Sequence, residues 1–274
     1  MKYYFFSLVE IGLLLDRIIF KRVFYYLAAD VYLLYKTRNL KEYKIIKKVV
    51  DNPIIIGGCA RSGTTLLLAI LSSHSKIHAI PYESEIFRTR QYPSRHIKLI
   101  TLYNYILRNN IRDINISICE KTPRNILSID DIMAYFGENF KFINIVRDGR
   151  DVVTSIHPQD PDTFWVKPER WVCSLNKGML YKNHPQVLTI FYEDLILDFN
   201  TVLLKICKFI NLEYTDNIKE YQEYSTLSNI HNKKVEAPYN DSINRWKEEK
   251  YKDIIGELLS DERAVELLKY YKYL

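Results

Sequence analysis

A glycine-rich turn between an apolar strand and an apolar helix is the feature of this sequence that most restricts its fold. The β-branched run Ile54 to Ile56 is typical of a buried strand, and the leucine-rich run Leu66 to Leu71 is typical of a buried helix. Between them, Gly58 and Gly63 have the spacing of the phosphate-binding pattern G-x-x-x-x-G-K-[ST]. In such a loop, successive backbone N–H groups and the helix N-terminus surround an anion. We therefore expect an α/β, P-loop-type three-layer fold, with a central, mostly parallel sheet flanked by helices.

One position of this loop departs from the pattern of the nucleotide triphosphatases. Thr64 stands where that pattern has lysine, and the nearest cation, Arg61, lies on the other side of Gly63. Without the lysine, the loop is poorly equipped to neutralise the γ-phosphate of ATP or GTP. The sequence therefore favours a different anion, and a P-loop nucleotide kinase is kept as the alternative enzyme.

The pentapeptide in this loop resembles a known family. Arg61, Ser62, Gly63, Thr64 and Thr65 match, residue for residue, the first loop [RK]-S-G-T-T of the sulfotransferases that use 3′-phosphoadenosine 5′-phosphosulfate (PAPS). The resemblance implies that backbone groups and hydroxyls of these five residues hold the 5′-phosphosulfate. Taken alone, the pentapeptide also suits a simple helix N-cap after a tight turn.

A second motif, in the expected order along the chain, extends the resemblance. The sequence predicts a central strand over Phe142 to Val146 and a helix over Asp148 to Ile156. The family has an arginine at the end of this strand and a serine eight residues later, both on the 3′-phosphate, and Arg147 and Ser155 have that spacing. An arginine fork together with a hydroxyl distinguishes a 3′-phosphorylated adenosine from ATP. A surface ion pair within the motif is the alternative interpretation.

Candidate catalytic groups follow two further strands. Glu83 comes after a strand predicted over Ile77 to Ile80, and Lys121 comes after one predicted over Ile114 to Cys119. Ligands of doubly wound sheets bind outside the carboxyl ends of the strands, so both side chains are expected beside the loop.

The resemblance assigns roles to these two groups. Glu83 with the following serine resembles a Glu-Thr pair of the tyrosylprotein branch, which implies that Glu83 is the general base. A lysine at the corresponding strand end of that branch implies that Lys121 stabilises charge on the leaving oxygen. His74 and His78 are alternative bases, since the cytosolic branch uses a histidine. Without the resemblance, Glu83 would be read as a helix cap and Lys121 as an ordinary ion-pair partner.

Two elements nearer the C-terminus also match the family. A strand is predicted over Val187 to Tyr192, and the family commonly has Tyr-Glu-Asp-Leu at its end, which implies that Tyr192 contacts the adenine. Tyr192 also suits a core position with its hydroxyl satisfied. Ser242, Arg245 and Trp246 resemble the Ser-x-x-Arg-Trp element of bacterial-type members, in a segment that closes over the nucleotide.

Together, these matches imply a PAPS-dependent sulfotransferase that moves a sulfuryl group to an acceptor hydroxyl by in-line displacement, without a metal. The acceptor, whether tyrosine, carbohydrate, lipid or small alcohol, is left open, and no nucleic-acid partner is expected. A non-catalytic nucleotide-binding scaffold is the alternative from another functional class. The net charge of +6 agrees with an anionic ligand but does not by itself decide between these functions.

The four cysteines indicate the compartment. They show no C-x-x-C spacing and no partnering histidine cluster, so neither a zinc site nor a dithiol motif is predicted. Free thiols are typical of a reducing compartment, and we expect a cytoplasmic protein.

The N-terminal segment is apolar but carries charges. We expect residues 1–51 to form an apolar helical segment with a basic connector, and residues 52–274 to form the sulfotransferase domain. Charges such as Glu10 and Asp16 disfavour both a membrane span and a signal peptide. Glu10, Arg17 and Lys21 share one side of a helix, which leaves a broad apolar surface on the other side. Packing on its own domain is one interpretation, and peripheral contact of residues 3–34 with a membrane, or with a partner protein, is the other.

Overall fold

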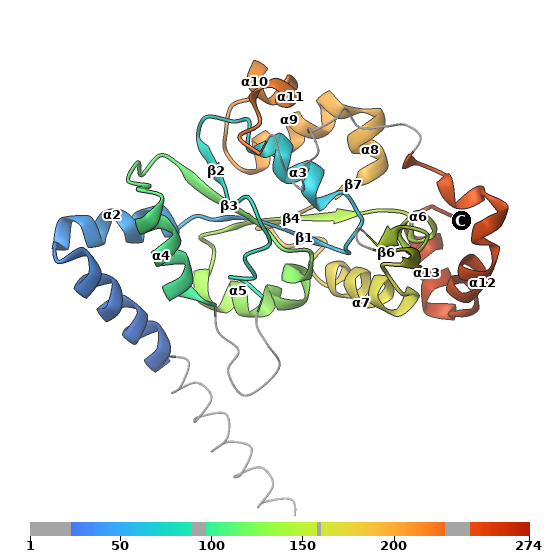
Figure 1. Ribbon diagram of the computed structural model, residues 1–274, viewed down its shortest axis with the longest axis horizontal. Helices are drawn as coiled ribbons and strands as arrows, with labels where there is room; N and C mark the ends of the chain where they lie inside the picture. Colours follow the sequence, from blue (N-terminus) through green and yellow to red (C-terminus); the bar gives the residue numbers. More distant parts are fainter. Residues whose placement is uncertain (1–22, 89–96, 158–159, 228–241) are drawn as a thin grey trace, which may run out of the picture.

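A five-stranded parallel sheet forms the centre of the molecule in the computed structural model, which describes residues 23–88, 97–157, 160–227 and 242–274 (Figure 1). The strand order is β2-β3-β1-β4-β7, and all neighbouring strands run parallel. The strands are β1 (Ile54–Gly58), β2 (Ile77–Ala79), β3 (Ser117–Lys121), β4 (Lys141–Val146) and β7 (Val187–Phe191). A separate antiparallel pair consists of β5 (Ile156–His157) and β6 (Asp160–Phe164).

Helices cover both faces of the sheet (Figure 1). One face carries α3 (Thr64–Leu71), α8 (Tyr192–Leu197), α9 (Phe199–Phe209), α10 (Asp216–Lys219) and α11 (Tyr221–Tyr224). The opposite face carries α4 (Leu99–Arg108), η1 (Pro123–Ser128), α5 (Ile129–Phe136) and α7 (Pro168–Met179). The other helices are α2 (Leu40–Val50), α6 (Gly149–Val153), η4 (Arg245–Lys247), η5 (Glu249–Tyr251), α12 (Lys252–Ser260) and α13 (Glu262–Tyr270). The predicted three-layer α/β fold is thus confirmed.

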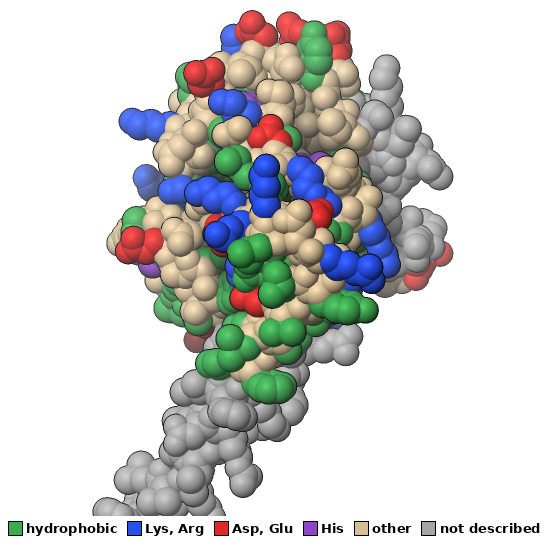
Figure 2. All heavy atoms as spheres, turned by 90° about the vertical axis from the view of Figure 1, so that its left-hand side faces the viewer, with side chains coloured by type: hydrophobic (Ala, Val, Ile, Leu, Met, Phe, Trp, Pro, Cys, Tyr) green, Lys and Arg blue, Asp and Glu red, His purple; other side chains and the backbone are tan. Residues whose placement is uncertain are grey.

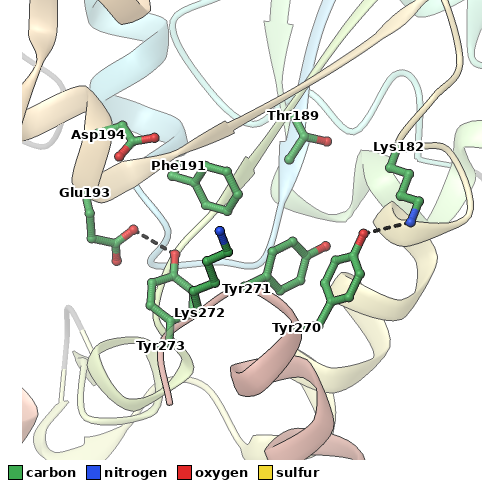
Figure 3. Close-up of a pocket in the computed structure, with 9 residues that line it drawn as sticks. All are labelled: Lys182, Thr189, Phe191, Glu193, Asp194, Tyr270, Tyr271, Lys272 and Tyr273. Atoms are coloured by element: carbon green, nitrogen blue, oxygen red, sulfur yellow. Dashed lines mark hydrogen bonds between the residues drawn. The ribbon is translucent and has the colours of Figure 1, made fainter.

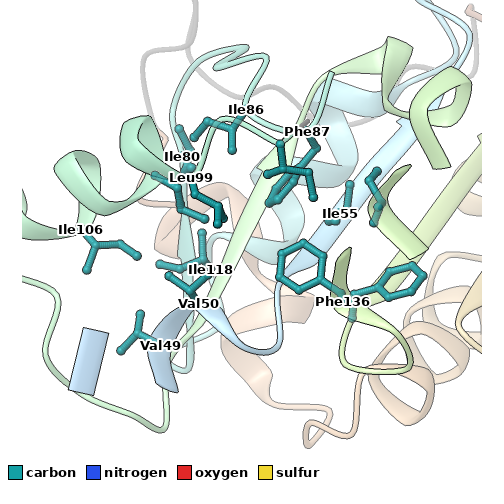
Figure 4. Close-up of a cluster of buried hydrophobic side chains, with 14 of the residues drawn as sticks. Val49, Val50, Ile55, Ile80, Ile86, Phe87, Leu99, Ile106, Ile118 and Phe136 are labelled. Atoms are coloured by element: carbon teal, nitrogen blue, oxygen red, sulfur yellow. The ribbon is translucent and has the colours of Figure 1, made fainter. Parts of the chain in front are cut away.

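Alternate residues of the central strand β1 build the two layers of the core. Ile55 belongs to the cluster under α4 and α5, whereas Ile54 and Ile56 belong to the cluster under α3 and α9. Figure 4 shows the first cluster, in which Phe87 and Phe136 pack together with their ring centres 5.9 Å apart. Because all five residues of β1 are buried, its C-terminal end is rigidly held where the glycine-rich loop begins.

Residues before position 52 are part of this same core. The described chain starts with a helix over residues 23–37, in which Ala29 and Leu33 are fully buried. Val49 and Val50 of α2 pack into the same cluster (Figure 4). The boundary at residue 52 stays a prediction, and the interpretation of residues 3–22 falls outside the described residues.

Two predicted elements differ from the observed ones by three residues at one end. The third strand begins at Ser117 instead of Ile114, because Asp113 accepts a hydrogen bond from the Asn115 N–H (2.9 Å) and turns the chain there. The helix after β4 ends at Val153 instead of Ile156. There the Ser155 hydroxyl donates to the Asp151 carbonyl (2.9 Å), and the following residues enter β5.

Candidate functional site

The glycine-rich loop has the backbone conformation of an anion cradle. Arg61 (φ 69°) and Gly63 (φ 92°) both lie in the left-handed region, on either side of Ser62. A Cβ at Gly63 would lie 2.4 Å from the Tyr192 ring, so this position requires glycine for space as well as for conformation. Helix α3 starts at the next residue, Thr64, so its free N–H groups face the loop.

A cavity of about 270 Å³ lies at the N-terminus of α3. Its lining contains residues from four separate stretches of the chain: Arg61, Gly63, Thr64, Thr65, Leu66, Arg147, Ser155, Tyr192, Ser242 and Arg245. All but one of the residues predicted for cofactor binding therefore line one cavity. The exception, Ser62, is fully buried in the loop that forms the wall.

Arg147 is held in this cavity by groups that the sequence alone could not place. Its two terminal nitrogens donate to the carbonyls of Arg61 (2.9 Å) and Ser242. Its guanidinium lies 4.2 Å from the centre of the Tyr192 ring, and the Tyr192 hydroxyl is 2.7 Å from that of Ser242. The loop after β1, the end of β4, the start of α8 and the segment before η4 are thus joined at one point.

Several buried donors in and around the cavity have no partner among the residues that the structure describes. The Ser62 hydroxyl, the Arg147 Nε and the Arg245 Nε are buried without a hydrogen bond. Burial lowers the pKa of Arg61, and the nearby positive charges of Arg147 and Arg245 lower it further. Buried polar groups in native proteins are normally paired, and like charges repel, so this arrangement fits an anion with several oxygens.

Asp151 fixes the segment that closes this cavity. Its carboxylate accepts from the backbone N–H groups of Asn244 (2.9 Å) and Trp246 (3.1 Å). Burial raises the pKa of Asp151, and the neighbouring Arg147 and the two N–H groups oppose that rise. Asp151 thus holds the backbone on both sides of Arg245, in the segment that also contains Ser242.

Glu83 and Lys121 form an ion pair at the carboxyl end of the sheet. Lys121 Nζ donates to Glu83 Oε1 at 2.7 Å. The Lys121 side chain is only 6% exposed, whereas that of Glu83 is 52% exposed. Lys121 is the last residue of β3 and lies opposite Ile56 of β1, two residues before Gly58. The structure therefore brings both predicted catalytic residues together beside the loop.

Glu120, next to Lys121, has a different environment. Its fully buried carboxylate accepts hydrogen bonds from Ser84 (2.8 Å), Thr122 (2.7 Å) and Asn125 (2.7 Å). Burial raises the pKa of Glu120, and these three donors counteract the rise. The Ser84 bond ties the loop that carries Glu83 to β3.

The two histidines considered as bases are engaged elsewhere. His74 Nδ1 accepts from the Lys76 N–H (3.1 Å), and its Nε2 lies 3.1 Å from the Glu213 carbonyl, so Nε2 carries the proton. His78 Nε2 is 2.9 Å from the Tyr105 hydroxyl. Neither side chain lines the cavity described above.

A larger cavity of about 580 Å³ contains none of the predicted site residues. Figure 3 shows that Phe191, Glu193 and the C-terminal tyrosines line it, with Tyr273 donating to Glu193 (2.8 Å) and Lys182 donating to Tyr270 (2.8 Å). The other oxygen of Glu193 accepts from the Asp148 N–H (3.0 Å). This cavity therefore lies next to the end of β4. Its lining contains both cations and carboxylates, so it does not favour a ligand of one charge.

Comparisons with known proteins agree with this site. A family model for the sulfotransferase domain matches residues 51–255. A protein-tyrosine sulfotransferase of Drosophila melanogaster is 23% identical over 206 residues, which cover 64% of this chain and 41% of that protein. Protein-tyrosine sulfotransferase A of Caenorhabditis elegans is 23% identical over 245 residues, which cover 75% of this chain and 63% of that protein.

The chain thus matches less than two thirds of the length of these two relatives. The fold is similar to that of the sulfotransferase domain from the curacin biosynthetic pathway, with a TM-score of 0.52 at 16% identity over 78% of this chain and 99% of that one. The family match covers the loop, the end of β4, Tyr192, Arg245 and the Glu83–Lys121 pair in a single stretch. The chain belongs to the sulfotransferase family.

Proposed function

We propose that this chain transfers a sulfuryl group from PAPS to the hydroxyl of a tyrosine in a protein. One observation carries this proposal: a single cavity collects the [RK]-S-G-T-T loop, Arg147, Ser155 and Tyr192, and unpaired buried donors surround it. The 5′-phosphosulfate would bind at the loop and the α3 N-terminus. The 3′-phosphate would bind at Arg147 and Ser155, and the adenine would lie at Tyr192.

The ion pair beside the loop supplies the chemistry of this proposal. Glu83 takes the proton of the acceptor hydroxyl as the new S–O bond forms. The bond between sulfur and the bridging phosphate oxygen breaks at the same time, and adenosine 3′,5′-bisphosphate leaves. Lys121 is nearly buried, so its ammonium stabilises negative charge on the leaving oxygen more strongly than an exposed cation would.

The surroundings of Glu83 support an acceptor with negative charge near its hydroxyl. Arg170 interacts electrostatically with Glu83, Arg88 and Arg124. Burial lowers the pKa of Arg170, Cys59 and Glu83 oppose this shift, and the positive charges of Arg124 and Arg88 add to it. Such a cluster of cations attracts an acidic peptide. The names of the two relatives likewise contain protein tyrosine as the acceptor.

Transfer from sulfur-labelled PAPS tests the proposal. A tyrosine peptide with acidic neighbours should become labelled, and the same peptide with phenylalanine in place of tyrosine should not. Label on a carbohydrate, lipid or small alcohol instead of the peptide would overturn the acceptor assignment. A protein that binds the bisphosphate but labels no acceptor of the panel would favour the scaffold interpretation.

A further inference from the structure

The outer face of the helix over residues 23–37 is apolar, although it lies at the surface. Phe24 (64% exposed), Leu27 (59%), Val31 (68%) and Tyr35 (68%) follow one another at helical spacing along this face. A surface helix normally has mostly polar residues on its outer side, whereas the outer side of this helix is mostly apolar. We call these four residues the outer apolar face.

Asp30 and Tyr32 of the same helix form hydrogen bonds with other elements of the fold and fix the orientation of the helix. Asp30 accepts hydrogen bonds from Lys47 (3.0 Å) and from the Tyr103 hydroxyl (2.8 Å). The Tyr32 hydroxyl donates to Asn104 (2.8 Å). Leu33 is fully buried on that side. Because the inner face is held by packing and by an ion pair, the outer apolar face cannot rotate into the core.

A band of cations follows this face along the chain. Lys36, Arg38, Lys41, Lys44 and Lys48 are exposed, and within the described ranges none of them forms an ion pair. Figure 2 shows Lys and Arg side chains gathered on this side of the molecule, above a group of apolar side chains. We call these five residues the basic band.

We propose that the outer apolar face and the basic band bind the surface of an anionic lipid bilayer, with the helix lying in the plane of the interface. Apolar side chains enter the boundary between headgroups and acyl chains, and cations contact the anionic headgroups. Residues 1–22, which precede this face in the sequence, are rich in aromatic and aliphatic residues. Among the helices that the structure describes, none has the length and apolar content of a membrane-spanning segment.

Charge argues against a second copy of the chain as the occupant. A two-fold dimer on this face would place the same surface of each chain against the other. The two basic bands would then face one another, and like charges in contact oppose association. An anionic surface has the complementary charge instead.

Flotation of the full chain with vesicles tests this proposal. The parent should bind vesicles that contain phosphatidylglycerol more strongly than vesicles of phosphatidylcholine alone. The double variant Lys41→Gln, Lys44→Gln should lose about fivefold in partitioning per removed cation on the anionic vesicles, and much less on the neutral ones. The variant Leu27→Ser should lose about tenfold on anionic vesicles. Leu204→Ser, an exposed leucine of α9 on the other side of the sheet, is the matched control and should bind like the parent.

Three results would overturn the proposal. The first is background binding of the parent to both kinds of vesicle, and the second is unchanged binding by the charge and apolar variants. The third is a lipid-free dimer in light scattering that Leu27→Ser dissociates, which would assign the face to a second copy. Each variant's melting shift with adenosine 3′,5′-bisphosphate shows that the fold and the cavity are intact, so a failure here is distinguishable from a failure of the proposed activity.

Discussion

At the scale of single residues, the site depends on charges whose environments differ sharply over a short distance. Glu120 and Glu83 are both neighbours of Lys121. Glu120 is fully buried and accepts hydrogen bonds from three side chains, whereas Glu83 is half exposed and accepts one, from Lys121. A carboxylate with free lone pairs that is open to an incoming hydroxyl is suited to accept a proton. Glu120, whose donors already occupy it, instead holds the loop in place.

Replacing Glu83 should separate chemistry from binding. We expect Glu83→Gln to lower single-turnover transfer by about 10² to 10⁴-fold, because the amide cannot accept the proton, with the affinity for adenosine 3′,5′-bisphosphate unchanged. Glu85→Gln, in the same loop but paired with Arg88, is the control and should keep the parent's rate. Normal turnover by Glu83→Gln, together with collapse in His78→Ala, would reassign the base to histidine.

His74 predicts a dependence of stability on pH. Burial lowers the pKa of His74 from its ordinary value of 6.5. Because the pKa of His74 is lower in the folded chain than in the unfolded chain, protonation of His74 favours unfolding. Stability is therefore unaffected by His74 above about pH 6.5 and is lost as the pH falls from there through the folded pKa. The urea midpoint of the parent should therefore drop more steeply below about pH 6.5 than that of His74→Asn, whose oxygen still accepts the Lys76 N–H. Parallel pH profiles would contradict this account.

At the scale of elements, the sequence predicted most of what surrounds the loop, because those segments are apolar and local. Strand β1, helix α3 and strand β4 lie within two residues of their predicted bounds. The third strand and the helix after β4 were wrong at their ends, where Asp113 and Ser155 divert the backbone through side-chain hydrogen bonds. Such local competition cannot be read from apolar periodicity.

Contacts between distant elements were beyond the reach of the sequence. Ser242 and Arg245 had been noted only through their resemblance to a family element, yet they line the same cavity as Arg147, about a hundred residues earlier. Their proximity depends on Asp151, which binds the backbone of the intervening segment. The run Arg-Asp-Gly-Arg-Asp gave no signal that its second aspartate would have this role.

Asp151 should act on nucleotide affinity through that segment. We expect Asp151→Asn to weaken binding of adenosine 3′,5′-bisphosphate by about tenfold or more, because a charge-assisted acceptor for two N–H groups is lost. The melting temperature without ligand should fall much less than the affinity does, since burial disfavours the ionised form of Asp151 in the parent. Calorimetric titration gives the affinity, and Asp216→Asn on the exposed surface is the control. Parent-like affinity in Asp151→Asn would show that the segment is held by other contacts.

At the scale of the whole molecule, the helix over residues 23–37 lies at one edge of the fold with α2 and α4, away from α6 and α12 at the other edge (Figure 1). The core that supports β1 includes side chains from residues 29–50, which the sequence had assigned to a separate segment. This helix has apolar residues on both sides, so its sequence alone does not predict which side is buried. The contacts of the helix with α2 and α4 determine that Ala29 and Leu33 are the buried residues.

The two sides of that helix should differ in their effect on stability. Leu33→Ala should lower the free energy of unfolding by about 2 to 5 kcal/mol, because Leu33 is fully buried. Leu27→Ala, on the exposed side of the same helix, should change it by no more than about 0.5 kcal/mol. Denaturant unfolding of both variants measures the difference. Equal effects would mean that the helix does not pack as described.

The central claim is that one cavity recognises a 3′-phosphorylated adenosine, and thermal unfolding with matched nucleotides tests it most directly. Adenosine 3′,5′-bisphosphate and ADP carry the same number of phosphates in different places, so a difference between them reports the 3′-phosphate. We expect the bisphosphate to raise the melting temperature far more than ADP, since a ligand at 100 times its Kd stabilises by about 2.7 kcal/mol. Arg147→Ala should abolish the difference. Equal stabilisation of the parent by the bisphosphate and by ATP with magnesium would contradict the account.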